Sequence, residues 1–227
     1  MSENPELLIV EHVLDAVADQ RLQAGTKLGE QALSDLFSCN RAHVRRALAT
    51  LAAHQVVDLI PNRGAFVATP SEAEARDVFQ ARRAIEATII RNVVRNADAA
   101  DLTALRAHLE EEDRVRGASD RPRAIRASRA FHMLLGRIGR NSVLEKYLSE
   151  LTMRTSLIIG LYGSNRASLC DDDEHSRIVE SIANRDEATA QNMVDMHLRH
   201  IESEIDFGKE RPRVGPLSVL FQPTSPE

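Results

Sequence analysis

Three histidines in the second half of the chain are the residues best suited to bind a metal ion. His132, His175 and His197 each lie three or four residues from an aliphatic side chain, so each falls on the apolar face of an expected helix. Three inward histidines on facing helices could converge on one point, where zinc or a similar ion would accept imidazole nitrogens. A single such histidine is more often a hydrogen-bonded core residue, so the pattern leaves both interpretations open.

A second group of residues suited to binding chemistry lies in residues 30–51. Two short apolar faces, Leu33, Leu36, Phe37 and Val44, Leu48, Leu51, are joined by the polar turn Ser38-Cys39-Asn40. Asn40 suits the N-cap of the second helix, because its side-chain oxygen can accept a free backbone amide. Arg41, Arg45 and Arg46 face away from the apolar positions, where arginines can bind guanine edges or phosphates. The pattern fits a helix-turn-helix, and equally an ordinary helical hairpin with a solvated basic face.

The residues that follow favour the helix-turn-helix. Residues 56–60 are rich in β-branched side chains, residues 61–64 have turn chemistry, and residues 65–68 are expected to return as a second strand. Gly64 can adopt the positive φ that such a turn requires. A β-hairpin directly after the second helix, with Arg63 at its tip, predicts a winged helix whose wing enters the minor groove.

Residues 7–69 resemble the winged-helix domain of the GntR-type bacterial transcription regulators. Residues 40–48 read NRAHVRRAL where that family usually reads SRTPVREAL, and residues 61–67, PNRGAFV, match the wing. The resemblance implies that Arg41 and Arg45 contact DNA and that Gly64 is the wing glycine. His43 and Arg46 stand where proline and glutamate are common, and they complete the expected DNA-binding set with Arg63. The extra charge of Arg46 is expected to alter base preference or phosphate binding.

Residues 72–205 resemble the all-helical FCD-type effector domain of the FadR-like branch of the same family. The resemblance is carried by four short stretches: Arg82 to Glu86, Phe131-His132 with the later Gly139-Arg140-Asn141, Glu174 to Ile178, and Met196-His197-Leu198. Members commonly bind a divalent metal through one aspartate and three histidines, and the metal helps to hold a small carboxylate.

The resemblance places the three histidine ligands at His132, His175 and His197, but the aspartate position is Ser128. A serine hydroxyl is a poor ligand for a divalent metal, although three imidazoles with waters can still hold zinc. Zinc or nickel is therefore expected here with reduced affinity. The alternative is a metal-free pocket in which the histidines bind an anionic effector directly. Arg82, Glu86 and Ser128 complete the expected effector-binding set.

The elements that must position these residues are mostly helical. Residues 5–20 predict a helix that supports the winged domain, and residues 23–28 predict a loop. Ser71 and Glu74 predict a capping box, and after it only helical periodicity is present, which predicts six helices in an antiparallel bundle. The acidic run at residues 110–113 is interpreted as a solvated helix face. The expected domains are 1–70, 71–209 and an extended or disordered tail over 210–227, in which residues 217–221 could dock on a partner surface.

The composition excludes few functions, but it limits the fold class, the distribution of charge and the cellular compartment that we expect. The chain has 227 residues with 4% aromatics and no tryptophan, which favours helices over sheets. Residues 1–70 hold six Lys and Arg against eight Asp and Glu, so positive charge is local rather than general. Cys39 and Cys170 are expected to be free thiols, Cys39 as a small buried side chain rather than a redox sensor. No signal peptide or membrane span is recognisable, which predicts a soluble, cytoplasmic protein.

Together these features predict a homodimeric transcription regulator. It is expected to act as a repressor that binds double-stranded operator DNA and responds to a small organic acid. One alternative is a three-histidine metalloenzyme. The sequence contains no HExxH, GxSxG, Walker A or GxGxxG pattern, and no carboxylate is evident beside the histidines. The other alternative is a protein-interaction module, whose binding would lack the steep salt dependence of phosphate contacts.

Overall fold

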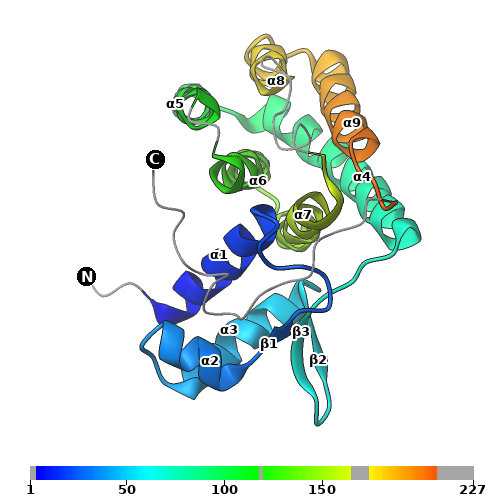
Figure 1. Cartoon of the computed structure of the whole chain (residues 1–227). Coiled ribbons are helices and arrows are strands. Elements are labelled where there is room, and N and C mark those ends of the chain that lie inside the picture. The colour runs from blue at the N-terminus through cyan, green and yellow to red at the C-terminus, as the bar shows by residue number, and fades with distance from the viewer. Residues whose placement is uncertain (1–3, 118–119, 165–173, 209–227) are drawn as a thin grey trace.

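A computed structural model describes residues 4–117, 120–164 and 174–208. The N-terminal module contains three helices and three strands (Figure 1). They are α1 (Pro5–Ala18), β1 (Lys27–Leu28), α2 (Glu30–Leu36), α3 (Arg41–Ala53), β2 (Val57–Ile60) and β3 (Gly64–Val67). The expected winged helix-turn-helix is therefore present.

The turn between α2 and α3 forms as the residue types predict. Asn40 is the N-cap of α3, and its side-chain oxygen accepts a hydrogen bond from the backbone amide of His43 at 3.0 Å. Leu33 of α2 and the apolar positions of α3 are buried in one core. Leu36 departs from the prediction, because it is 38% exposed rather than part of the buried face.

The wing is a three-stranded antiparallel sheet with strand order β1-β3-β2. The prediction of a loop over residues 23–28 is wrong at its end, because Lys27 and Leu28 pair with β3. Two residues are too few to show the alternation by which a strand is recognised in a sequence. Gly64 has the expected positive φ of 103°, and Asn62 in the turn also has a positive φ of 61°.

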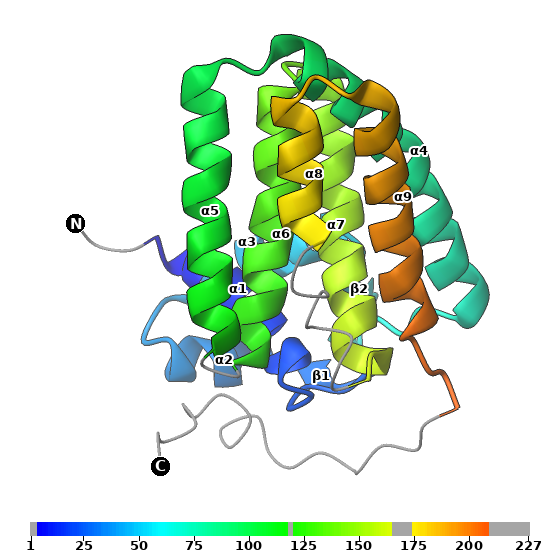
Figure 2. The ribbon, with the colours of Figure 1, turned by 90° about the horizontal axis from the view of Figure 1, so that it is seen from above.

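The second module is a bundle of six long helices (Figure 2), as expected. They are α4 (Glu72–Asn96), α5 (Ala99–Gly117), α6 (Arg121–Ile138), α7 (Ser142–Tyr162), α8 (Glu174–Ala183) and α9 (Glu187–Ser203). Helix α4 packs on α7 and α9, α6 packs on α5 and α7, and α8 packs on α9. The capping box is present at the start of α4, where Ser71 and Glu74 each bond the backbone amide of the other.

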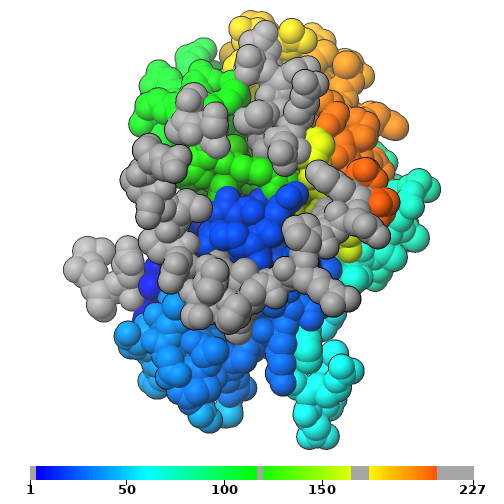
Figure 3. All heavy atoms as spheres, viewed as in Figure 1, coloured from blue at the N-terminus to red at the C-terminus, as the bar shows by residue number. Residues whose placement is uncertain are grey.

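Helix α1 joins the two modules, because it packs on α3 and also on α6 and α7. Figure 3 shows its blue surface between the bundle and the rest of the winged module. A Cβ at Gly160 of α7 would lie 2.7 Å from Val17 Cγ1 and 2.8 Å from the Val17 carbonyl oxygen. Glycine at this position therefore allows the backbones of α7 and α1 to approach closely.

Some expectations from the sequence concern residues outside the described ranges. The tail over 210–227 and Cys170 are among them. Cys39 is half-buried against the core of the winged module. Within the described ranges, none of the helices combines the length and the apolar character that crossing a membrane requires.

A candidate metal centre and a candidate DNA-binding surface

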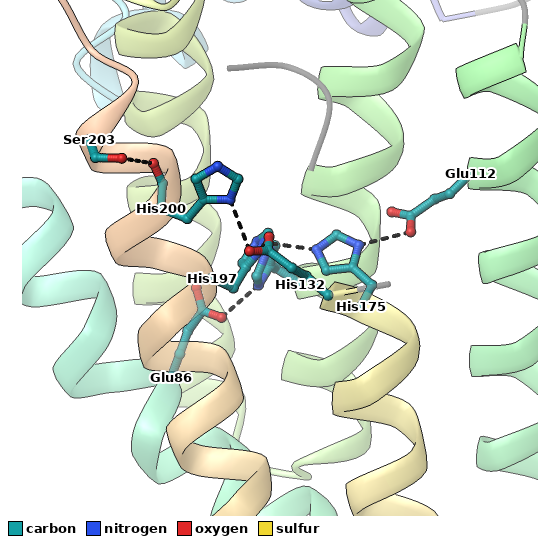
Figure 4. A network of polar contacts seen from close by, with 8 residues as sticks. Glu86, Glu112, His132, His175, His197, His200 and Ser203 are labelled. Atoms are coloured by element: carbon teal, nitrogen blue, oxygen red, sulfur yellow. Dashed lines mark hydrogen bonds and ion pairs between the residues drawn. The ribbon is translucent and has the colours of Figure 1, made fainter. Parts of the chain in front are cut away.

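The three histidines singled out in the sequence meet at one point inside the bundle (Figure 4). His132 comes from α6, His175 from α8 and His197 from α9, and their side chains are 0%, 4% and 0% exposed. Nε2 of His197 lies 3.2 Å from Nε2 of His132 and 3.2 Å from Nε2 of His175. The bundle therefore brings together residues that are 65 positions apart in the chain.

Each of these imidazoles contacts a glutamate through Nδ1, the ring nitrogen that faces away from the common point. The Nδ1 atom of His132 lies 2.6 Å from Glu86, that of His175 lies 2.8 Å from Glu112, and that of His197 lies 2.8 Å from Glu174. The interpretation that no carboxylate stands beside the histidines is therefore wrong. Glu86 is on α4 and Glu112 on α5, far from the histidines in sequence, so no local motif could have revealed the pairing.

The interpretation of residues 110–113 as a solvated face is also wrong for one residue. Glu112 is 7% exposed and points to His175, whereas Glu110 on the same helix is exposed. Helical geometry explains the difference, because two residues along a helix differ in direction by about 200°. The acidic run therefore divides between the interior and the solvent.

The charge states follow from burial and from these contacts. Burial lowers the pKa of His132 to about 3 and that of His197 to about 4, so both imidazoles are neutral at pH 7. Burial alone would raise the pKa of Glu86, but attraction and hydrogen bonds from His132 and Arg82 outweigh it and lower that pKa. The pKa of Glu112 is lowered against burial in the same way, by His108 and His175.

This pattern fixes the tautomers. An ionised carboxylate only accepts hydrogen bonds, so each Nδ1 carries the proton and donates it to its glutamate. The neutral imidazoles of His132 and His197 then present an unprotonated Nε2 to the common point, where Nε2 of His175 lies 3.2 Å from that of His197. Lone pairs at such short separations repel one another unless a cation lies between them.

The donor set fits a divalent metal ion. Four-coordinate zinc with Zn–N bonds of 2.0–2.1 Å separates its nitrogen ligands by roughly 3.3 Å, close to the spacing in this site. Among the described residues, these three histidines form the group whose donor atoms lie close enough together, within 4.8 Å, to hold one ion. Hydrogen bonds from Nδ1 to carboxylates are the usual outer support of metal-binding histidines.

Only some of the other residues expected at the effector site belong to the buried network. Arg82 is 3% exposed, and its Nε donates to Glu86 at 2.5 Å, so Arg82 and Glu86 both belong to the buried network. Ser128 is half-buried on α6, one turn before His132. Arg129 on the same helix binds Glu11 of α1, and Arg137 is exposed.

Two histidines of the network were not expected from the sequence. His200 Nδ1 lies 2.9 Å from Glu174, and His108 Nε2 lies 3.4 Å from Glu112. Both residues sit at i+3 or i−4 from a member of the network, on α9 and α5 respectively. That helical spacing is the one signal that could have found them.

The second candidate site is the surface formed by α3 and the wing. Arg41, Arg45 and Arg46 are all exposed on α3, and Arg63 and Gly64 are exposed on the wing. His43 lies between the arginines and is half-buried. A groove lined in part by Arg45, Leu48, Pro61 and Asn62 runs between the helix and the hairpin. Of the expected DNA-binding residues, Arg45 and Gly64 line this groove.

The arginines of α3 have partners within the winged module. Arg45 Nε lies 2.8 Å from Glu30, Arg46 Nε lies 2.7 Å from Glu6, and Arg41 Nε donates to Gln31 at 2.8 Å. The two ion pairs are exposed, so phosphate groups can compete for these arginines at small cost.

Sequence reasoning missed a cation at the wing. Lys27 of β1 lies over the Phe66 ring with Nζ 5.9 Å from its centroid, and Arg63 lies over the ring at 5.5 Å. Lys27 reaches the wing because β1 pairs with β3, whereas Arg63 belongs to the turn between β2 and β3. This pairing was the part of the fold that the sequence did not reveal.

Comparison with known proteins agrees with the architecture. The family described as bacterial regulatory proteins, gntR family, matches residues 6–67, and the FCD domain matches residues 77–200. The chain therefore belongs to the GntR family of transcription regulators, with an FCD domain after its winged helix.

Individual relatives and solved structures are consistent with this assignment. The regulator YdhC of Bacillus subtilis (strain 168) is 23% identical over 82% of this chain and 86% of its own length. LutR of the same organism is 24% identical over 82% of this chain and 94% of its own length.

Two solved structures share the fold. Escherichia coli McbR/YncC has a TM-score of 0.73 at 16% identity, covering 88% of this chain and 95% of that one. A regulator from Rhodococcus sp. RHA1 has a TM-score of 0.73 at 20% identity, covering 91% of this chain and 99% of that one. The families and named relatives are DNA-binding regulators rather than enzymes, which disfavours the metalloenzyme alternative.

Proposed function

We propose that this chain is a homodimeric cytoplasmic repressor that binds double-stranded operator DNA and is released by a small organic acid. The observation that carries the effector part of the proposal is the convergence of the Nε2 atoms of His132, His175 and His197 at one buried point of the FCD domain. A protein interior rarely leaves buried ring nitrogens without a partner. The site is therefore suited to a divalent metal, zinc or nickel, and to an anion bound beside it.

The DNA contacts are assigned to α3 and the wing. In a dimer, two copies of α3 would enter successive major grooves of a pseudo-palindromic operator. Arg41 and Arg45 would read base edges, while Arg46 and His43 lie where they can meet the phosphate backbone. Arg63 and Gly64 at the wing tip would meet the adjacent minor groove.

The effector contacts are assigned to the metal centre. A bound divalent ion supplies a Lewis-acidic position for a carboxylate oxygen. His132, His175 and His197 would hold that ion, and Ser128 leaves its side of the centre without a protein anion. A negatively charged effector would fill this position. Arg82 and Glu86 would contribute one positive and one negative charge beside it.

The route from the centre to the DNA surface runs through α6 and α1. Helix α6 carries His132, and it also carries Arg126 and Arg129, which pair with Asp15 and Glu11 of α1. Helix α1 in turn carries Glu6, the partner of Arg46 on α3. Movement of α6 on effector binding would therefore shift α1 and α3 together and change operator affinity.

The first test is the metal content of the purified protein, measured by mass spectrometry without added metal or chelator. A near-stoichiometric ion in the wild type, absent from His132→Ala and retained in His12→Ala, is the expected result. His12 is an exposed histidine of α1 and serves as the matched control. Absence of metal in the wild type, even after incubation with zinc or nickel, would support the metal-free anion pocket instead.

The second test measures the regulatory response. An operator selected from a random DNA library is labelled, and its affinity for the metal-loaded protein is followed by fluorescence anisotropy with a panel of small carboxylates. Release of DNA by one class of carboxylate, lost in His132→Ala, is the expected result. Tighter binding with the carboxylate would identify an activator or co-repressor mode and contradict the proposed sign.

A further inference from the structure

We infer that Glu86, Glu112 and Glu174, which contact the Nδ1 atoms of the three imidazoles, supply the negative charge that a divalent ion needs in this centre. The inference rests on the proposed metal site. The inference adds an outer ring of carboxylates, formed by Glu86, Glu112 and Glu174, that sets the metal affinity of this chain. Glu112 and Glu174 are assigned to that ring as positioning residues.

The first observation is charge balance. Imidazole ligands bring no negative charge, so by themselves they leave a divalent ion uncompensated inside the bundle. Three glutamate carboxylates lie on the far side of the rings, and the buried guanidinium of Arg82 lies beside Glu86. The three carboxylate charges equal those of a divalent ion and the guanidinium together, which favours cation uptake in this buried place.

The second observation is that Glu86 and Glu174 are each held on two sides. Glu86 bonds Arg82 as well as His132, and Glu174 bonds His200 at 2.9 Å as well as His197 at 2.8 Å. Glu112 bonds His175 Nδ1 at 2.8 Å through Oε2, while its Oε1 lies 3.4 Å from Nε2 of His108, which bonds the Ala127 carbonyl. A carboxylate held on two sides keeps its orientation, so the Nδ1–H···O contacts of Glu86 and Glu174 fix the rings that carry the metal-binding nitrogens.

The third observation concerns the rings themselves. The ring of His175 stacks on Phe131 with centroids 4.0 Å apart, and the ring of His108 stacks on the same Phe131 at 6.0 Å. Phe131 thus contacts the rings of both His175 and His108. With Glu112 bonded to His175 at its polar edge, the ring of His175 is constrained both by its face and by its Nδ1 atom.

The test separates charge from geometry at Glu112. Glutamine at this position still offers an oxygen to His175 Nδ1–H but removes the negative charge. The matched control is Glu110→Gln, which removes an equal charge from the exposed face of the same helix. Zinc affinity of the full-length proteins is measured by competition with a chromophoric chelator, and folding is checked by circular dichroism and thermal melting.

The expected result is a loss of zinc affinity of about 10-fold to 100-fold in Glu112→Gln, and no loss in Glu110→Gln. A second variant, Ser128→Asp, adds an anion one turn before His132. In that background the effect of Glu112→Gln should shrink, because a carboxylate beside the metal supplies the charge directly.

Three other results have defined meanings. Equal zinc affinity in the wild type and Glu112→Gln would overturn the inference while leaving the metal site intact. An undiminished effect in the Ser128→Asp background would overturn the charge argument, since the two carboxylates would then act independently. If the wild type binds no zinc, nickel or cobalt, both the proposed metal site and this inference fall.

Cobalt gives a readout that does not depend on affinity. In the wild type and in Glu112→Gln, the visible d–d bands of bound Co²⁺ should be alike, because the three coordinating imidazoles are unchanged. In Ser128→Asp the bands should shift as an oxygen ligand enters. A changed spectrum in Glu112→Gln would mean that Glu112 coordinates the ion, which would contradict its assignment to the outer ring.

Discussion

Arg129 of α6 donates hydrogen bonds to both carboxylate oxygens of Glu11 in α1, at 2.9 and 2.8 Å. Three residues later on α6, His132 points into the bundle and reaches the cluster of three histidines. One helix therefore touches both the centre and the helix that supports the DNA-binding surface. The Arg129 side chain is 13% exposed and that of Glu11 is 36% exposed, so water screens the pair only in part.

This pair leads to a prediction about coupling. Glu11→Gln should leave zinc affinity unchanged and reduce the effect of zinc and carboxylate on operator affinity, because one of the two ion pairs that join α6 to α1 is lost. The coupling factor is the ratio of operator dissociation constants with and without ligand, measured by anisotropy. Asp113→Asn removes an exposed carboxylate from α5 and should keep the wild-type ratio. An unchanged ratio in Glu11→Gln would show that the Arg129–Glu11 pair does not carry the coupling.

The DNA-binding surface can be tested at Arg45. Its side chain is 66% exposed, and Arg45→Ala should weaken operator binding by about 1–3 kcal/mol at fixed salt if Arg45 reads a base. Anisotropy titration against the selected operator and a base-substituted operator gives both affinity and specificity. Arg106→Ala, an exposed arginine of α5, is the control and should bind as the wild type does. Unchanged affinity in Arg45→Ala would remove Arg45 from the reading set.

The contact between α1 and α7 predicts an effect on stability. Gly160→Ala adds a methyl group where Val17 Cγ1 and the Val17 carbonyl oxygen lie within 3 Å, so the two backbones must separate. The expected loss is about 1–3 kcal/mol in the free energy of unfolding, from denaturant titration. Gly29→Ala is the comparison, since its Cβ would meet its nearest neighbour, Ala32 Cβ, at 3.8 Å. Equal effects of the two substitutions would contradict the tight contact.

The convergence of the three Nε2 atoms at one buried point predicts that metal stabilises the fold. At a free zinc concentration 100 times the dissociation constant, the gain is about 2.7 kcal/mol. For a chain of this size that gain corresponds to a rise in Tm of roughly 5–10 °C, measured by calorimetry with and without chelator. His132→Ala should show no such rise. A wild-type melting curve that is insensitive to both zinc and chelator would count against the site.

Much of the winged module was predictable because its signals are local. The apolar spacing of Val44, Leu48 and Leu51 determines the face of α3 that is buried, and Asn40 determines where α3 begins. Ser71 and Glu74 likewise mark the start of α4, since a capping box needs only residues one turn apart. Strand β1 escaped prediction because its two residues are strand only by pairing with β3.

For the metal centre, the sequence by itself determined which histidines face inward, because helical periodicity places His132, His175 and His197 on apolar faces. Only the tertiary structure decided that their Nε2 atoms meet, and that Glu86 and Glu112 stand behind two of the rings. The reason is physical: helical spacing fixes direction around one axis, whereas the meeting of side chains depends on how separate helices pack. Glu112 is the clearest case. An acidic run predicts a solvated helix face, but the packing of α5 against α6 and α8 buries Glu112.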